Sequence, residues 1–178
     1  MAVLTAAVII VGGLCSLDLL LTFGVIRRLR EHTSMLAAAA GQAESTVGLA
    51  VGESPGEFTA TTNSGDVLTG PAGLRVVAFF SSWCSACPER VPPFLEYVNR
   101  HRIGRDSVLA VVAQDSTARA PYLDRLAKVA HVCVEPSDGE ITKAFQVSGF
   151  PAFCLLDADG AIAVSGYNPS ALPEPVTV

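Results

Sequence analysis

The chain has 178 residues, of which 50% are hydrophobic and 16% are charged, and its formal net charge is −5 at pH 7. This length suits one domain of ordinary size with its own hydrophobic core. The negative charge, and the lack of a basic groove interleaved with aromatic residues, argue against nucleic acid as a partner.

Much of the apolar excess lies at the start of the chain. Residues 3–26 are almost continuously apolar, and a helix of that length, at about 1.5 Å per residue, crosses a hydrocarbon core of about 30 Å. We therefore expect residues 1–32 to hold one transmembrane helix in the lipid bilayer and its basic flank. Asp18 inside it costs about 2.5–3.5 kcal/mol at the membrane centre. It either marks a partner membrane protein or lies near enough to an interface to stay hydrated.

Three arginines follow the apolar segment, namely Arg27, Arg28 and Arg30, whereas no basic residue precedes it. A cleavable signal peptide has its basic residues first, so this segment is predicted to remain as an anchor. The positive-inside rule then places the residues after the anchor in the cytoplasm. Residues 33–49 are rich in Ala, Gly, Ser and Thr, which is typical of a linker.

The next segment predicts a hairpin, a strand and a helix. Residues 58–62 and 66–69 flank a turn at 63–65, and the apolar, β-rich run at 76–80 predicts a strand over residues 75–80. Apolar residues at helical spacing then indicate a helix from Cys84 or Ser85 to about His101.

The second half continues with alternating elements. Strands are predicted at 107–113, 131–134, 152–156 and 161–164, and helices at 117–130 and from the capping pair Ser137 and Glu140 to 146. This order predicts an α/β fold, a mixed sheet with helices on both faces. Residues 168–178 contain three prolines and predict an irregular tail. Without a final helix, either another segment covers that face or the domain is less stable.

Cys84 and Cys87 carry the strongest chemical signal, because a strand delivers both to the expected start of a helix. Unpaired N–H groups and the helix dipole stabilise a thiolate there, so we expect a lowered pKa for Cys84. Cys87, one turn along, can resolve a mixed disulfide. The other Cys and His residues supply no second ligand pair for zinc. We therefore expect neither a metal site nor a cofactor, although two thiolates also suit Cu(I).

The sequence Trp83-Cys84-Ser85-Ala86-Cys87, followed by Gly149-Phe150-Pro151, resembles the thioredoxin superfamily. Pro92 and the lead-in at 51–58 are more similar to the TlpA-like membrane-anchored disulfide reductases, over residues 50–167. The resemblance implies a thioredoxin-like domain in which Cys84 is the nucleophile and Cys87 resolves. It also implies that a cis Pro151 lies against the dithiol, with Phe150 and Trp83 beside a bound client.

This sequence departs from the thioredoxin pattern at one position. Thioredoxins usually bury an acid in the strand before the dithiol, where Ala78 stands in this chain. Proton transfer then needs water or another carboxylate. Glu89 is near in sequence, but an acid early in a helix also simply complements the helix dipole.

The resemblance also bears on the side of the membrane, because TlpA-like domains work on the outer face of the plasma membrane. The layout of anchor, basic segment, linker and thiol domain is similar to accessory proteins of methylamine dehydrogenase maturation, which face the periplasm. We favour the outer face over the cytoplasmic face that Arg27, Arg28 and Arg30 indicate.

These signals predict a membrane-anchored thiol–disulfide oxidoreductase that reduces or isomerises disulfides in client proteins. Two alternatives use the same dithiol: a copper metallochaperone, and a peroxiredoxin-like peroxidase suggested by the lead-in at 51–58. Cys133 and Cys154 fall in predicted strands, where they are either free, buried thiols or a second disulfide.

Overall fold

A computed structural model describes residue 12 and residues 47–115 and 120–174. The chain divides into two compact units, Met1–Ser45 and Thr46–Val178. Except for Gly12, the predicted anchor lies outside the described residues, as do Asp18, Arg27, Arg28 and Arg30. Within the described ranges, the structure contains no helix with the length and apolar character needed to span a bilayer.

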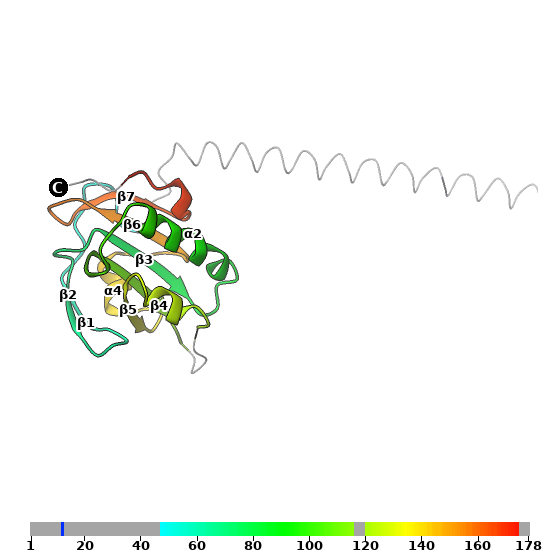
Figure 1. Cartoon of the computed structure of the whole chain (residues 1–178), viewed down its shortest axis with the longest axis horizontal. Coiled ribbons are helices and arrows are strands. Elements are labelled where there is room, and N and C mark those ends of the chain that lie inside the picture. The colour runs from blue at the N-terminus through cyan, green and yellow to red at the C-terminus, as the bar shows by residue number, and fades with distance from the viewer. Residues whose placement is uncertain (1–11, 13–46, 116–119, 175–178) are drawn as a thin grey trace, which may run out of the picture. The chain divides into compact units, whose positions relative to one another are not determined.

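The second unit is built on a five-stranded mixed sheet with the strand order β5-β4-β3-β6-β7 (Figure 1). Strands β3, β4 and β5 are parallel to one another. Strand β6 pairs antiparallel with β3, and β7 pairs antiparallel with β6. Their bounds are Val76–Ser81, Val108–Ala113, His131–Glu135, Ala152–Leu156 and Ile162–Gly166. Every residue of β3 and β4 is buried, because both faces of these central strands are covered, which explains their continuous apolar sequence.

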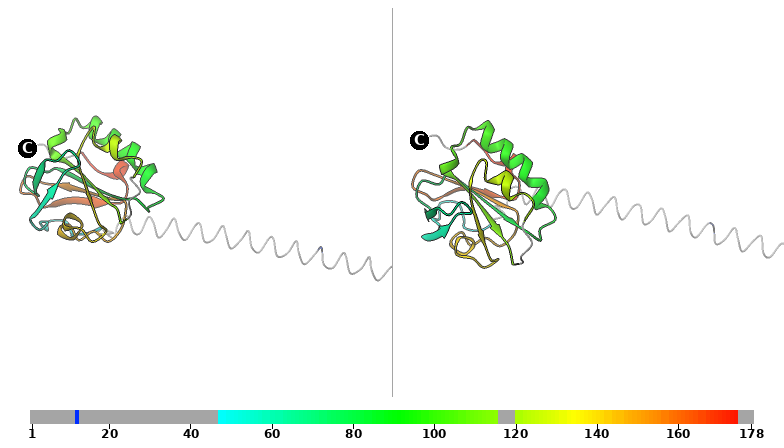
Figure 2. Two further views of the ribbon diagram at one scale, coloured as in Figure 1. Left: turned by 90° about the horizontal axis from the view of Figure 1, so that it is seen from below. Right: turned by 60° about the horizontal axis from the view of Figure 1, so that its bottom comes forward.

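Helices cover both faces of this sheet (Figure 2). Helices α2 (Cys87–Arg100) and α3 (Leu123–Leu126) pack on the face that includes Phe80. Helix α4 (Glu140–Ala144) packs on the opposite face, which includes Phe79. The predicted fold class is confirmed for the described residues.

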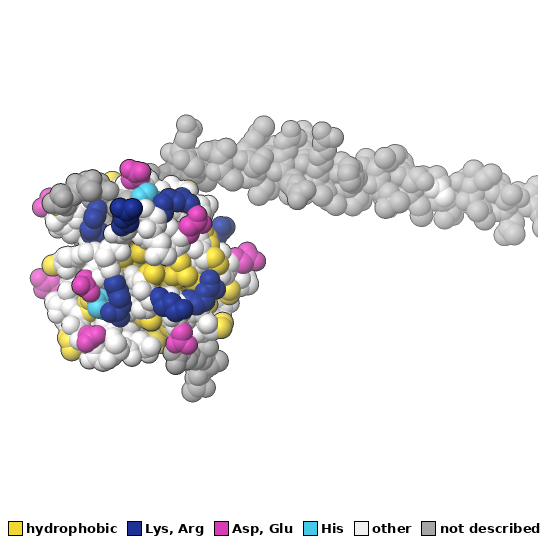
Figure 3. All heavy atoms as spheres, in the orientation of Figure 1, with side chains coloured by type: hydrophobic (Ala, Val, Ile, Leu, Met, Phe, Trp, Pro, Cys, Tyr) yellow, Lys and Arg dark blue, Asp and Glu magenta, His cyan; other side chains and the backbone are white. Residues whose placement is uncertain are grey.

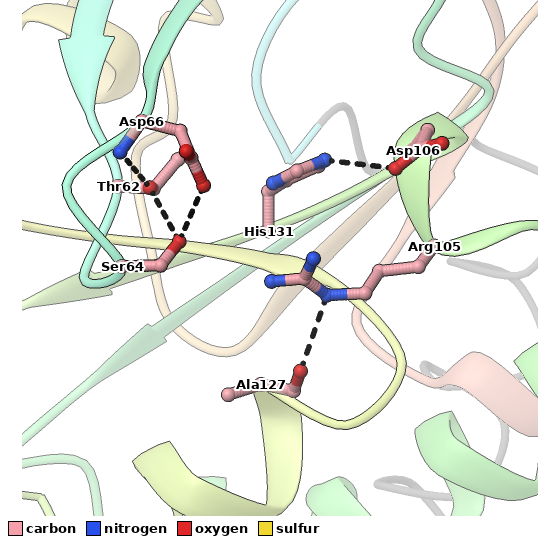
Figure 4. Close-up of polar contacts among 7 residues, drawn as sticks. All are labelled: Thr62, Ser64, Asp66, Arg105, Asp106, Ala127 and His131. Carbon is pink, nitrogen blue, oxygen red and sulfur yellow. Dashed lines mark hydrogen bonds and ion pairs between the residues drawn. The ribbon is translucent and has the colours of Figure 1, made fainter.

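The predicted hairpin is also present. Strands β1 (Phe58–Thr61) and β2 (Val67–Gly70) pair antiparallel. Their turn holds Gly65 at φ 91, a value that glycine adopts without steric cost. The Thr62 Oγ1 accepts a 3.0 Å hydrogen bond from the Asp66 N–H, and the Ser64 hydroxyl donates to the Asp66 carboxylate at 2.7 Å (Figure 4).

A short 3-10 turn, η1 (Arg105–Ser107), makes contacts with both the first residue of β5 and the end of α3. The His131 Nε2 lies 3.3 Å from the Asp106 Oδ1, and the Arg105 Nε donates to the Ala127 carbonyl at 3.3 Å (Figure 4). His131 therefore has a structural contact at the strand edge.

Two helix predictions were wrong in detail. The predicted helix over 117–130 is reduced to Leu123–Leu126 within the described residues, and the chain then closes in turns in which Ala130 N donates to Leu126 O. The predicted capping pair does not begin α4, because its N-cap is Gly139. The Glu135 carboxylate, at the end of β5, accepts the first-turn N–H groups instead.

Residues near both ends of the second unit pack against its core. Val47 and Leu49, at the end of the segment predicted as linker, are buried in the core on the α4 side. The segment predicted as an irregular tail contains the 3-10 turn η2 (Pro169–Ala171), which packs against α2. The Tyr97 hydroxyl donates to the Pro173 carbonyl at 2.7 Å. The C-terminal segment, rather than a final helix, therefore covers part of the α2 face.

Candidate active site

The two cysteines of the motif lie where β3 passes into α2. Cys84 is half-buried in the connecting turn, and Cys87 is the first residue of α2 and is completely buried. Two turn bonds set this path, from Cys84 N to Ser81 O at 3.3 Å and from Cys87 N to Cys84 O at 3.2 Å. Both thiols are free. The prediction that the helix begins at Cys84 or Ser85 was wrong, so Cys84 lies just before the first helical turn.

A second segment reaches the same place from the far half of the chain. The Phe150–Pro151 peptide bond is cis, as the sequence predicted. The Cys84 Sγ donates to the Phe150 carbonyl oxygen at 3.5 Å. The Trp83 and Phe150 rings meet edge to face, with centroids 6.0 Å apart and planes at 83°. The structure thus brings together all five residues that the sequence singled out for the site.

Exposure separates the roles that these side chains can take. Trp83 is 52% exposed, so about half of this residue is open to a partner molecule. Only Cys84 of the two thiols is accessible, since Cys87 is 0% exposed. A disulfide of another molecule can therefore reach Cys84 directly, whereas Cys87 is within reach only of groups already inside the site, such as a sulfur held at Cys84.

The environment of Cys87 keeps it protonated. Burial, followed by a hydrogen bond with the Cys84 side chain, raises the pKa of the Cys87 thiol to about 12. The Ser81 backbone opposes this and lowers that pKa. The Ser81 N–H lies 3.5 Å from the Cys87 Sγ, within the range for a hydrogen bond to sulfur. At neutral pH Cys87 is a thiol that must lose its proton before it attacks.

The structure adds two residues that sequence reasoning missed, Ser81 and Tyr122. The Tyr122 hydroxyl donates to the Ser81 carbonyl at 2.8 Å. Burial, with smaller effects of Cys87 and Cys84, raises the pKa of the Tyr122 phenol. No local pattern marks either residue, because only the fold brings Tyr122 to the end of β3.

Ala78, which the sequence comparison set against the buried acid of thioredoxins, lies in the core. Ala78 is completely buried on the α2 face of β3, so no carboxylate stands at that position. Glu89 is exposed on α2. Its position in the first turn suits the dipole-complementing alternative.

Cys133 and Cys154 do not form a disulfide. They lie on β5 and β6, which are separated by β4 and β3, and both are free and buried. Three strand spacings of about 4.8 Å put them far beyond the roughly 7 Å limit between bridged Cα atoms. Within the described residues, no group of three or more His, Cys, Asp or Glu side chains could hold a metal ion.

Solved structures share this architecture. The thioredoxin domain of a thiol-disulfide oxidoreductase from Bacteroides vulgatus matches with a TM-score of 0.54 and 18% identity, covering 67% of this chain and 90% of that one. The chain has the thioredoxin fold.

Two further solved structures match the same fold. A thio-disulfide isomerase from Thermus thermophilus matches with a TM-score of 0.50 and 16% identity over 67% of this chain and 87% of that one. A thiol-disulfide oxidoreductase from Bacteroides fragilis matches with a TM-score of 0.51 and 15% identity over 64% and 89%. No protein-family model and no curated protein matches this thioredoxin-fold chain.

The surface of this thioredoxin-fold domain is mixed in character. On the face that carries α2 and α3, hydrophobic side chains show between groups of Lys and Arg side chains (Figure 3).

Proposed function

We propose that the protein is a membrane-anchored thiol–disulfide oxidoreductase that reduces or isomerises disulfides in client proteins. The observation that carries this proposal is the contact between the accessible Cys84 thiol and the Phe150 carbonyl, beside the buried Cys87. An accessible thiol backed by a buried second thiol supports two-step exchange through a mixed disulfide, and the Phe150 carbonyl beside it offers a backbone group to an extended client segment.

The reaction proceeds through a mixed disulfide. The Cys84 thiolate attacks one sulfur of a client disulfide, so that a Cys84–client S–S bond forms and the other client sulfur leaves as a thiolate, which takes up a proton. Cys87 then loses its proton and attacks Cys84 Sγ. The Cys84–Cys87 bond forms, the client's second sulfur leaves, and two electrons have passed to the client.

Phe150, Pro151 and Trp83 orient the client in this proposal. An extended client segment pairs with the backbone of Phe150, which aligns its disulfide with Cys84. The half-exposed Trp83 ring covers the apolar side of that segment. The edge-to-face contact of Trp83 with Phe150 holds both rings beside the sulfur.

The membrane part of the proposal rests on the sequence. Residues 3–26 supply an anchor, and Asp18 marks the contact with a partner membrane protein that passes electrons to or from the dithiol. The TlpA-like lead-in favours the outer face. The similarity in layout to methylamine dehydrogenase maturation proteins supports a client that is a secreted or cofactor-bearing protein.

The activity is tested with the full chain in the insulin reduction assay, with dithiothreitol as the electron source. We expect turnover by the parent and none by the Cys84→Ser variant. Cys133→Ala, which removes a thiol on the opposite face of the sheet, is the matched control and should retain turnover. Tight Cu(I) binding without insulin reduction would favour the metallochaperone, and peroxide consumption would favour the peroxidase.

The side of the membrane is tested in intact cells with a membrane-impermeant maleimide. Labelling of Cys84 without permeabilisation is the result that an outer-face domain predicts. Labelling only after permeabilisation would assign the domain to the cytoplasm, as the three arginines indicate.

A further inference from the structure

The side chain of Ser81 is a buried polar group with no clear structural use. Ser81 is 1% exposed at the end of β3. Its Oγ has no hydrogen-bond partner of acceptable distance and angle among the described residues. Such a group costs stability when it stays unpaired, so its presence in the core needs another explanation.

The reactive group that Ser81 contacts is the sulfur of Cys87. The Ser81 N–H donates toward the Cys87 Sγ at 3.5 Å, and both the backbone and the hydroxyl of Ser81 lower the pKa of that thiol. The Ser81 hydroxyl is buried in the same residue that makes this contact, and it has no hydrogen-bond partner of its own in the described part of the chain.

A hydrogen bond from Tyr122 to the Ser81 carbonyl helps to fix the position of Ser81. The Tyr122 hydroxyl donates to the Ser81 carbonyl at 2.8 Å in a buried contact. Cys84 and Tyr122 are the titratable groups among the described residues that interact with Cys87. Neither is a carboxylate, and the groups that favour the Cys87 thiolate are the backbone and side chain of Ser81.

We propose that Ser81 is a catalytic residue for the resolving step, in which its N–H and its hydroxyl together bind the Cys87 thiolate. This inference rests on the proposed function and names the group that does the work of the missing acid. Ser81 takes up no proton itself, and the proton of Cys87 passes to water.

The effect is confined to the second half of the reaction. In the mixed disulfide, Cys84 has neither charge nor proton, so both of its effects that raise the pKa of Cys87 disappear. Burial remains, and the two donors of Ser81 oppose it. Cys87 then attacks Cys84 Sγ, the S–S bond between them forms, and the client thiolate leaves.

The expected magnitude follows from the loss of one donor. Removal of a hydrogen bond to a thiolate raises its pKa by about one. The thiolate fraction then falls about tenfold, and each remaining thiolate is about threefold more nucleophilic. The resolving step should slow about threefold at neutral pH.

The test uses the full chain and dithiobis(nitrobenzoate), a disulfide whose two halves leave as coloured thiolates. The first release reports attack by Cys84 and depends on probe concentration. The second release reports attack by Cys87 on the mixed disulfide and does not. The variants are Ser81→Ala and, as a matched control, its half-buried neighbour Ser82→Ala, both in the parent chain, and Cys84→Ser measures the release that the other cysteines cause.

For Ser81→Ala we expect an unchanged first phase, a second phase about threefold slower, and a pH midpoint of the second phase that is higher by about one. Its stability to urea should be equal or greater, since the lost hydroxyl is unpaired in the folded protein. Ser82→Ala should change neither phase. A second phase with the parent's rate and pH profile would overturn the proposal, as would equal slowing of both phases with lower stability.

A direct titration separates this inference from the proposed function. In the Cys84→Ser background, the ultraviolet absorbance of the thiolates reports Cys87 without any exchange reaction. Ser81→Ala should move part of this titration to higher pH, and an unchanged titration would refute the role of Ser81. Failure of the proposed function would instead appear as a missing first phase in the parent.

Discussion

Glu135 provides the sharpest test of how the sheet positions the active-site loop. One carboxylate at the end of β5 accepts the N–H of Ile141 at 3.0 Å, the N–H of Thr142 at 2.8 Å and the Thr142 hydroxyl at 2.6 Å. These bonds begin α4, which leads directly to the loop that carries Phe150. Glu135→Ala removes all three acceptors at once.

The cost follows from two effects. Loss of a capping acceptor costs about 0.5–2 kcal/mol. Thr142 is 5% exposed, so its hydroxyl and N–H are left buried and unpaired at a further cost of about 1–3 kcal/mol. We expect Glu135→Ala to lower the free energy of unfolding by about 1.5–5 kcal/mol, the sum of these two costs, measured by urea denaturation of the full chain.

Gly139 allows an independent disruption of the same contact. A Cβ added at Gly139 would overlap the end of the Glu135 side chain. Gly139→Ala should therefore displace the carboxylate and cost about 1–3 kcal/mol in the parent. In the Glu135→Ala background the obstruction is absent, so the same change should cost within about 1 kcal/mol.

Both substitutions remove the same Glu135 contact, so their costs should not add in the double variant. Additive costs of Glu135→Ala and Gly139→Ala would contradict this reasoning. It also fails if Glu135→Ala costs no more than the control Glu140→Ala, which removes an exposed acid from the first turn of α4. That control should cost about 0.5 kcal/mol.

Two further predictions concern the core. Burial raises the pKa of Cys154 to about 12 and of Cys133 to about 11, from 9.0. Above pH 9 the unfolded chain therefore releases protons that the folded protein keeps, so stability should fall between pH 9 and 11, by up to about 1.4 kcal/mol per pH unit for each thiol. Urea midpoints across this range check it; Cys133→Ala should reduce the slope, and a flat profile would contradict it. Gly48→Ala should cost about 1–3 kcal/mol, since its Cβ would overlap the Phe145 carbonyl, whereas Gly104→Ala, with open space, should cost much less.

The parts of the fold that were predictable from sequence are those with local signals. Residues 76–80 and 108–113 are apolar because both strands are covered on both faces, and the observed β3 and β4 agree with the strands predicted at 75–80 and 107–113 within a residue or two. The cis Pro151 and its approach to Cys84 came from the motif resemblance. These signals are contained in short stretches of chain.

The parts that were missed depend on contacts between distant segments. The cap of α4 comes from Glu135 on a strand, and local spacing pointed to Ser137 instead. Tyr122 reaches Ser81 across 41 positions of sequence. No local pattern marks such a pair, so the groups around Cys87 became visible only in the folded chain.

The most direct test of the central claim is the site of the mixed disulfide. The Cys87→Ser variant, mixed with oxidised client protein and quenched with acid, should accumulate a covalent adduct that mass spectrometry maps to Cys84. The Cys84→Ser variant, whose remaining motif thiol is completely buried, should form none. An adduct at Cys87 in that variant, formed as fast as the one at Cys84, would contradict the account.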